Sequence, residues 1–118
     1  MTTMITAPRT GTTRRAGLQL SSEWVTSTVV RISASGEVDA SNSAELLDFV
    51  LRRGANCRSL ILDLSAVTFF ATAGFSALHT IDLRSSRASV SWSLVDGPAV
   101  SRMLSICDPK RTLPRGIA

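Results

Sequence analysis

The chain has 118 residues, of which 44% are hydrophobic and 5% aromatic, and a formal net charge of +4. This length fits one globular domain with a core of its own, and the apolar fraction excludes a wholly disordered chain. Residues 17–109 carry seven arginines against nine acidic residues, a net charge of −2, so the basic excess belongs to the two ends and the body offers no basic groove for nucleic acid.

Metal and membrane functions also lack the residues they need. The two cysteines, Cys57 and Cys107, and the single histidine, His79, form no CxxC or Cys/His cluster. The N-terminus has no apolar stretch of a secretory signal, and no run approaches the roughly 20 apolar residues of a membrane span. We therefore expect a soluble, cytoplasmic protein with two unbridged thiols, no metal, no cofactor, and no membrane or nucleic-acid partner.

The N-terminal third predicts a tail followed by two strands. Residues 1–17 lack hydrophobic periodicity and predict a flexible basic tail. Residues 18–25 alternate weakly, as in an edge strand. Residues 28–38 predict a stronger strand that ends in Gly-Glu-Val-Asp at residues 36–39. Its expected core-facing residues are Val30, Ile32 and Ala34.

The next segment predicts a helix. Asn42 and Glu45 have the spacing of a capping box, which would place the start of the helix at Asn42. Arginines at 52 and 53 and glycine at 54 are typical of a helix C-terminus. The expected apolar stripe is Ala44, Leu47, Val50 and Leu51.

The second half predicts a strand, a helix, a strand and a helix. The unbroken run at residues 60–62, closed by Asp63, indicates a central strand covered on both faces, followed by a loop over residues 64–70. A helix is expected over residues 72–84 and a strand over 90–94. The last helix opens at Gly97-Pro98 and ends at Pro109, before a short basic tail at residues 110–118. The expected inward residues of the two helices are Ala77, Leu78 and Ile81, then Val100, Met103, Leu104 and Cys107.

The alternation of strands and helices predicts one α/β domain over residues 18–109, with a mixed, mostly parallel sheet of about four strands against about three helices. Asp39 and Asp63 follow predicted strands and Thr72 starts a helix, so all three are expected on one rim of the sheet. Structural roles are open for each: Thr72 as a helix N-cap, and Asp39 and Asp63 as residues that end strands or cap turns. An enzyme using Asp39 or Asp63 as a base lacks a nucleophile–base pair.

Three segments resemble the STAS domain family. Residues 63–75 read D-L-S-A-V-T-F-F-A-T-A-G-F and resemble the signature D-L-S-x-V-x-F-I/M-D-S-S/A-G-L. Residues 36–39 are similar to the family's upstream G-E-I/L/V-D, and residues 97–104 are similar to its last-helix pattern P-x-V-x-R-V/M/L-L. The resemblance covers about residues 18–107 and implies a STAS-like fold.

The resemblance implies a regulatory protein without enzymatic activity, an anti-sigma factor antagonist. Such a protein binds an anti-sigma factor of the GHKL kinase type and releases its sigma factor. The kinase phosphorylates it at the position of Thr72, and a phosphatase resets it. The alternative is a non-phosphorylated STAS scaffold or oligomerisation module, and a monomer or weak homodimer fits either. The implied partner-binding residues are Asp39, Asp63, Ser65, Thr72, Gly74 and Phe75.

Two residues depart from the family signature, and two of the implied partner-binding residues have an alternative role. The family's Asp before the phosphorylated residue is Ala71 here, and its Ser is Thr72, which keeps the hydroxyl. Gly74 either lets a partner approach closely or serves helix packing. Phe75 is either a core residue or an exposed anchor.

Overall fold

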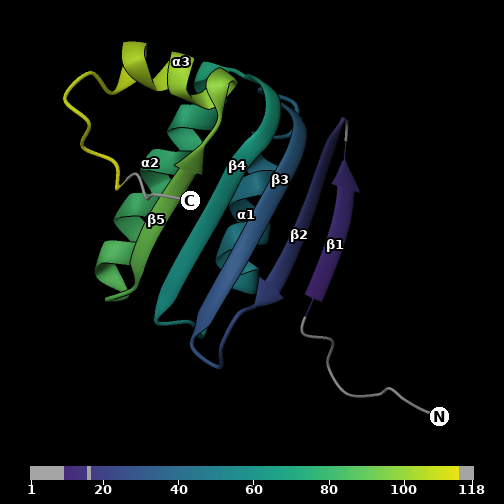
Figure 1. The fold of residues 1–118 in the computed structure, drawn as a ribbon, viewed down its shortest axis with the longest axis vertical. Helices are drawn as coiled ribbons and strands as arrows, with labels where there is room; N and C mark the ends of the chain where they lie inside the picture. The colour runs from purple at the N-terminus through teal and green to yellow at the C-terminus, as the bar shows by residue number, and fades with distance from the viewer. Residues whose placement is uncertain (1–9, 16, 115–118) are drawn as a thin grey trace.

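The structure, a computed structural model, describes residues 10–15 and 17–114. It is a single five-stranded sheet with three helices (Figure 1), in the order β1-β2-β3-β4-β5. β1 and β2, and β2 and β3, pair antiparallel, whereas β3 and β4, and β4 and β5, pair parallel. The predicted α/β class is confirmed. The elements are β1 (Thr10–Arg15), β2 (Leu18–Trp24), β3 (Val29–Val38), α1 (Ser43–Arg53), β4 (Ser59–Phe70), α2 (Thr72–Arg87), β5 (Ser91–Asp96) and α3 (Pro98–Cys107).

The prediction of a tail over residues 1–17 is wrong where β1 forms, at Thr10–Arg15. This strand pairs with β2 from Thr10 opposite Glu23 to Arg15 opposite Leu18, so β2 is not an edge strand. Its sequence, Thr-Gly-Thr-Thr-Arg-Arg, has no apolar alternation to reveal a strand. The rest of the predicted tail, residues 1–9 and 16, lies outside the described residues.

α1 and α2 lie side by side against one face of the sheet, and α3 lies across its upper end (Figure 1). Alternate residues of the two central strands are buried beneath α1 and α2, and the intervening ones face the open side. Ile61 is therefore only half-buried, and the prediction that this strand is covered on both faces is wrong. The core residues of these strands are Val30, Ile32, Ala34, Leu60, Leu62 and Leu64.

The loop predicted over residues 64–70 is wrong, because β4 continues to Phe70. The register with β3 shifts twice, so β4 carries extra residues opposite β3. Such bulges break the period-two pattern of a strand. The buried residues of β4 then fall three apart, at Leu64, Val67 and Phe70, and the sequence loses the alternation that identifies a strand.

α1 forms where predicted, but its buried residues are Leu46, Phe49 and Val50. The buried face of α1 therefore differs from the predicted stripe, which shared only Val50 with it and omitted Leu46 and Phe49. Asn42 occupies the N-cap position of α1, as predicted, but its side chain makes no capping hydrogen bond to the helix. The fully buried Asn42 side chain accepts a hydrogen bond from Asp39 N (3.0 Å) and donates one to Glu37 O (2.9 Å), so it ties α1 to the end of β3.

The last three elements form where predicted, and the differences lie in α3 and in the C-terminal tail. α3 buries Val100 and Leu104 as expected, whereas Met103 and Cys107, also expected inward, are only half-buried. α2 buries Ala77, Leu78 and Ile81 as expected and runs on to Arg87. Part of the tail predicted over residues 110–118 is packed: Leu113 is 4% exposed in the core, and Leu94 N donates to Pro114 O (2.8 Å). A single apolar residue has no periodicity, so this contact could not be predicted from the sequence. Residues 115–118 lie outside the described residues.

Candidate functional site

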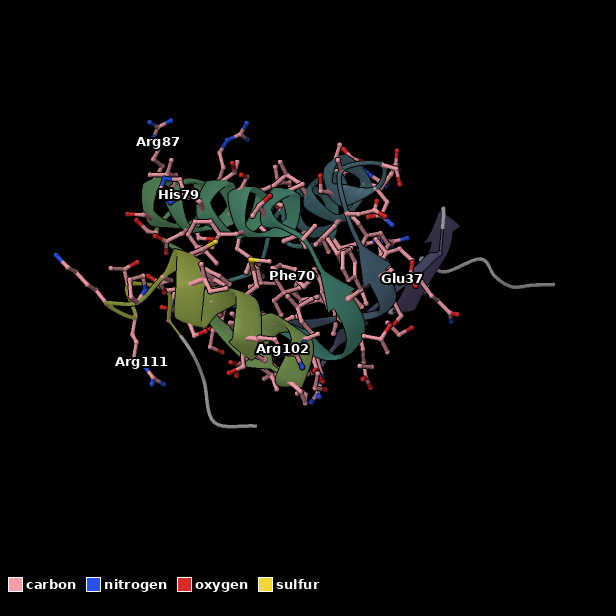
Figure 2. All side chains as sticks on the ribbon, turned by 90° about the horizontal axis from the view of Figure 1, so that it is seen from above. Glu37, Phe70, His79, Arg87, Arg102 and Arg111 are labelled. Atoms are coloured by element: carbon pink, nitrogen blue, oxygen red, sulfur yellow. The ribbon has the colours of Figure 1, made fainter. Side chains whose placement is uncertain are left out.

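The ends of β3 and β4 bring two loops together at one edge of the sheet. Val38 and Phe70, the last residues of these strands, are opposite in register, and Ala71 N donates to Val38 O (2.9 Å). Asp39, after β3, and Thr72, at the start of α2, therefore lie at the same edge, as predicted. We call Asp39, Ser41, Ala71 and Thr72 the rim. Figure 2 looks down on this end, with Phe70 between α2 and α3.

Asp39 is a fixed negative charge on the rim. Its Oδ1 accepts hydrogen bonds from Ser41 Oγ (2.6 Å) and Ser41 N (2.9 Å). These bonds hold the pKa of Asp39 below its ordinary value, since they favour the ionised carboxylate. Asp39 thus both shapes the loop between β3 and α1 and charges the surface beside Thr72.

Thr72 presents an exposed side chain at the first residue of α2. The N-cap position is occupied by Ala71, so the alternative in which Thr72 is the N-cap is wrong. The first N–H groups of a helix have no partner within the helix, and their partial positive charge favours an anion such as a phosphate. The rim therefore combines a hydroxyl and a helix start, which suit a phosphoryl group, with a carboxylate that makes the same edge negative.

Gly74 and Phe75 lie behind the rim. Gly74 is buried, and a Cβ on it would lie 2.6 Å from two carbons of the Phe70 ring. The geometry thus favours helix packing, rather than partner approach, as the reason for glycine here. Phe75 is half-buried and packs against the core, which favours its core role.

Asp63 and Ser65 form a second group, separate from Thr72. Asp63 lies inside β4, opposite Ser33 and Val95, because the strand continues past it. It pairs with Arg31 and accepts hydrogen bonds from Ser65 Oγ (2.6 Å) and Ser65 N (2.9 Å). The structure therefore does not bring Asp63 to the rim with Asp39 and Thr72.

Opposing effects act on the Asp63 carboxylate. Partial burial alone would raise the pKa of Asp63, but the hydrogen bonds from Ser65 and the Arg31 guanidinium outweigh burial and hold the pKa below its ordinary value. The group lies against the start of α3, since a Cβ on Gly97 would meet Ser65 O at 2.5 Å. Asp63 thus holds Ser65 through two hydrogen bonds, and the Ser65 backbone lies next to Gly97, the residue before α3.

The sequence did not reveal an apolar groove next to the rim. Phe69 and Ile106 are 53% and 72% exposed and flank a cavity of about 210 Å³ that Met103 and Arg102 also line. We call these four residues the α3 groove. Ile106 lies three residues after Met103, the one sign of a second apolar helix face. Exposed apolar surface of this kind is typical of protein contacts.

The described residues contain neither a cluster of metal-ligand side chains nor a helix that could span a membrane. Across residues 10–15 and 17–114, three or more His, Cys, Asp or Glu side chains nowhere gather as metal ligands would. In the same part of the chain, no helix has both the length and the apolar character needed to cross a bilayer.

Comparison with known proteins gives the family. The family model for the STAS domain matches residues 24–113. Osmosensory protein A of Mycobacterium tuberculosis is 36% identical over 73 residues, which cover 62% of this chain and 46% of that protein, so the chain spans about half the length of this relative.

Two solved structures share the fold. A crystal structure of an anti-sigma factor antagonist from Mycobacterium paratuberculosis superposes with a TM-score of 0.70 and 23% identity, covering 97% of this chain and 92% of that one. The anti-sigma factor antagonist SpoIIAA in its unphosphorylated form gives a TM-score of 0.63 and 17% identity, covering 76% and 79%. At these identities the likeness supports the fold alone, whereas the family model covers most of the sequence. The chain belongs to the STAS domain family.

Proposed function

We propose that this protein is an anti-sigma factor antagonist that binds its partner through the rim and is switched by phosphorylation of Thr72. The observation that carries the proposal is the exposed Thr72 side chain at the first residue of α2, beside Asp39. This is the position at which the family signature has its phosphorylated serine. The similar fold of two anti-sigma factor antagonists supports the same class.

The proposed partner is an anti-sigma factor of the GHKL kinase type in the cytoplasm. Binding of the unphosphorylated antagonist would release the sigma factor, and phosphorylation by the kinase would end the complex until a phosphatase resets Thr72. The domain is then a regulatory binding module and a substrate of the kinase. Asp39 and Thr72 would lie at the centre of the contact, with Asp63 and Ser65 toward α3.

The switch is electrostatic. Phosphorylation adds about −1.5 to −2 charges. Asp39, whose pKa is held low, already places a negative charge at this edge. Two like charges on a surface that loses water on docking oppose binding. The start of α2 stabilises the phosphate in the free domain, so phosphorylation weakens the complex without unfolding the protein.

The test uses the full chain with its cognate kinase. Thr72→Ala should abolish phosphate incorporation and keep partner binding, and Thr72→Glu should weaken binding about tenfold, or 1.4 kcal/mol. Ala71→Asp restores the family's carboxylate and should raise the phosphorylation rate. Ser43→Ala is the matched control, because Ser43 is the first residue of α1. Phosphate at another residue, or equal affinities for wild type and Thr72→Glu, would refute the switch.

The second candidate is a non-phosphorylated scaffold or oligomerisation module. Ala71 in place of the family's Asp favours it, and so does the α3 groove, which offers apolar contact without any modification. Partner binding that is independent of Thr72 but lost in Ile106→Ser would support this candidate. Light scattering would then show whether the partner is a second copy of the chain.

A further inference from the structure

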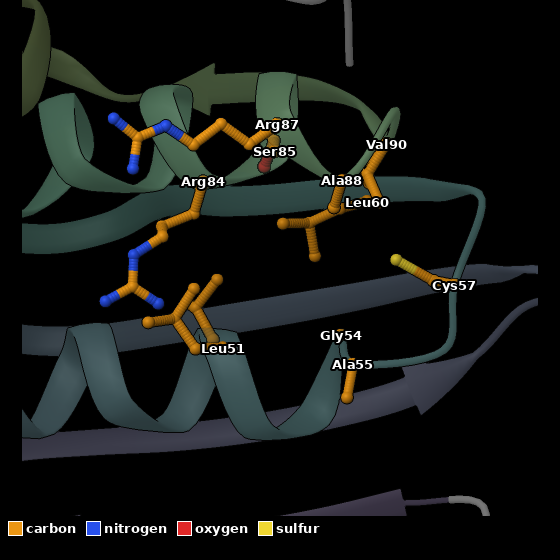
Figure 3. Close-up of a pocket in the computed structure, with 11 residues that line it drawn as sticks. Leu51, Gly54, Ala55, Cys57, Leu60, Arg84, Ser85, Arg87, Ala88 and Val90 are labelled. Carbon is orange, nitrogen blue, oxygen red and sulfur yellow. The ribbon is translucent and has the colours of Figure 1, made fainter.

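A second cavity lies at the end of the domain opposite the rim. It has a volume of about 340 Å³ and lies between the C-terminal ends of α1 and α2, where β4 and β5 begin (Figure 3). Its apolar lining includes Leu51 of α1, Leu60 of β4 and Val90 just before β5. Small-molecule sites occupy roughly 300–1,000 Å³, so this volume suits a small ligand.

Two cations of α2 line the same cavity. The Arg84 side chain extends from α2 toward Leu51 of α1, whereas the Arg87 side chain runs along the other side of α2, with its guanidinium away from that of Arg84 (Figure 3). Within residues 10–15 and 17–114, neither arginine has an ion-pair partner, and no Asp or Glu lines the cavity.

Helix stabilisation alone does not explain this placement. A cation in the last turn interacts favourably with the helix dipole wherever its side chain points. Arg52 also lies in the last turn of its helix, α1, but it pairs with Asp48 (2.8 Å) and does not line the cavity. Arg84 and Arg87 thus combine positive charge with an apolar wall, and Arg52 does not.

We infer that this cavity binds a small single-chain carboxylate, such as a medium-chain fatty acid. The chain would contact Leu51, Leu60 and Val90 and release water from their surfaces. The carboxylate would lie at the mouth and pair with Arg84, since a guanidinium group binds a carboxylate through paired, charge-assisted hydrogen bonds, and Arg87 would add positive charge at the same end of α2. This inference is independent of the proposed role of Thr72.

The two thiols provide a readout. Cys57 lines the cavity and is 7% exposed, whereas Cys107 lies outside it at the end of α3. Burial raises the pKa of the Cys57 thiol, so its alkylation is slow, and a bound chain should slow it further. Decanoate is therefore expected to lower the alkylation rate of Cys57 at least about tenfold at saturation, while the rate at Cys107, the internal reference, stays unchanged.

Three probes separate charge from chain length in the full protein. Acetate has the charge without the chain, decanol the chain without the charge, and decylamine the opposite charge. Only decanoate should protect Cys57 at submicellar concentration. The amide chemical shifts of Leu60 and Val90 give a second measurement that does not need a reactive thiol. They should change with decanoate and stay unchanged with acetate, decanol and decylamine.

The variants assign the contact. Arg84→Gln with Arg87→Gln should raise the decanoate concentration needed for half protection about tenfold, and both side chains are exposed, so folding should be kept. Arg52→Gln is the matched control and should behave as wild type. Three results would overturn the inference: no shift or protection by decanoate below its micelle concentration, equal effects of decylamine, or an equal loss of binding in Arg52→Gln.

Discussion

The two ends of the parallel strands differ in charge and in shape. The rim has the acid Asp39, a tight turn at Ser41 and the exposed Thr72, whereas the opposite end has Arg84 and Arg87 beside an apolar cavity. Helix polarity contributes to this difference, because acids are favourable where helices begin and cations where they end. One fold can thus have, at one end, a surface where a phosphate would weaken partner binding and, at the other end, a cavity that would attract an anion.

The largest contrast should come from two glycines. Gly74→Ala, near the rim, places a Cβ 2.6 Å from the buried Phe70 ring and should lower the free energy of unfolding by about 2–3 kcal/mol. Gly54→Ala, at the cavity end, meets Val50 O at 3.0 Å without positive φ and should change stability by less than about 1 kcal/mol. Urea unfolding measures both. Equal losses would show that the rim end is not the more tightly packed.

Acid should weaken the domain through its carboxylates and leave the arginines charged. The pKa values of Asp39 and Asp63 are lowered in the folded protein, so their contribution is present above their unfolded values, about 3.9, and is lost as pH falls through the folded values. Unfolding free energy measured from about pH 5 to pH 2 should fall, and less steeply in Asp63→Asn. A matched control is Asp48→Asn, because the exposed Asp48–Arg52 pair contributes little. Identical slopes for wild type and Asp63→Asn would contradict the role of the Arg31 and Ser65 contacts.

The smallest stability effect is expected at Thr72 itself. Since Ala71 occupies the N-cap position, Thr72→Ala removes only an exposed side chain and should change the free energy of unfolding by less than about 0.5 kcal/mol. Thermal unfolding checks this value. A loss near 1 kcal/mol, the usual cost of removing an N-cap, would show that the hydroxyl has a structural role after all.

The positions of periodic segments could be predicted from the sequence, although the buried face of α1 was not, and aperiodic segments could not be predicted. β3 and α2 bury the residues expected of them because their apolar residues follow one strand or helix period. β1 has no apolar period, the bulges of β4 break one, and Leu113 is a single residue. The bulges of β4 and the burial of Leu113 depend on contacts with distant parts of the chain, whereas β1 pairs with the strand that follows it.

The candidate site was predictable to the same degree. Asp39 and Thr72 follow the ends of β3 and β4, so connectivity alone placed them on one rim. Asp63 was misplaced because its polarity resembled a strand end, whereas it pairs with Arg31 inside β4. The α3 groove was missed because Phe69 and Ile106 come together only in the folded chain.

The most direct test compares the affinity of the cognate anti-sigma factor for the unphosphorylated chain and for the chain fully phosphorylated at Thr72. Titration calorimetry with the same two proteins would give both dissociation constants. The account predicts that phosphorylation weakens binding by at least about tenfold, or 1.4 kcal/mol, with no loss of folded protein. Equal dissociation constants for the two forms would contradict it.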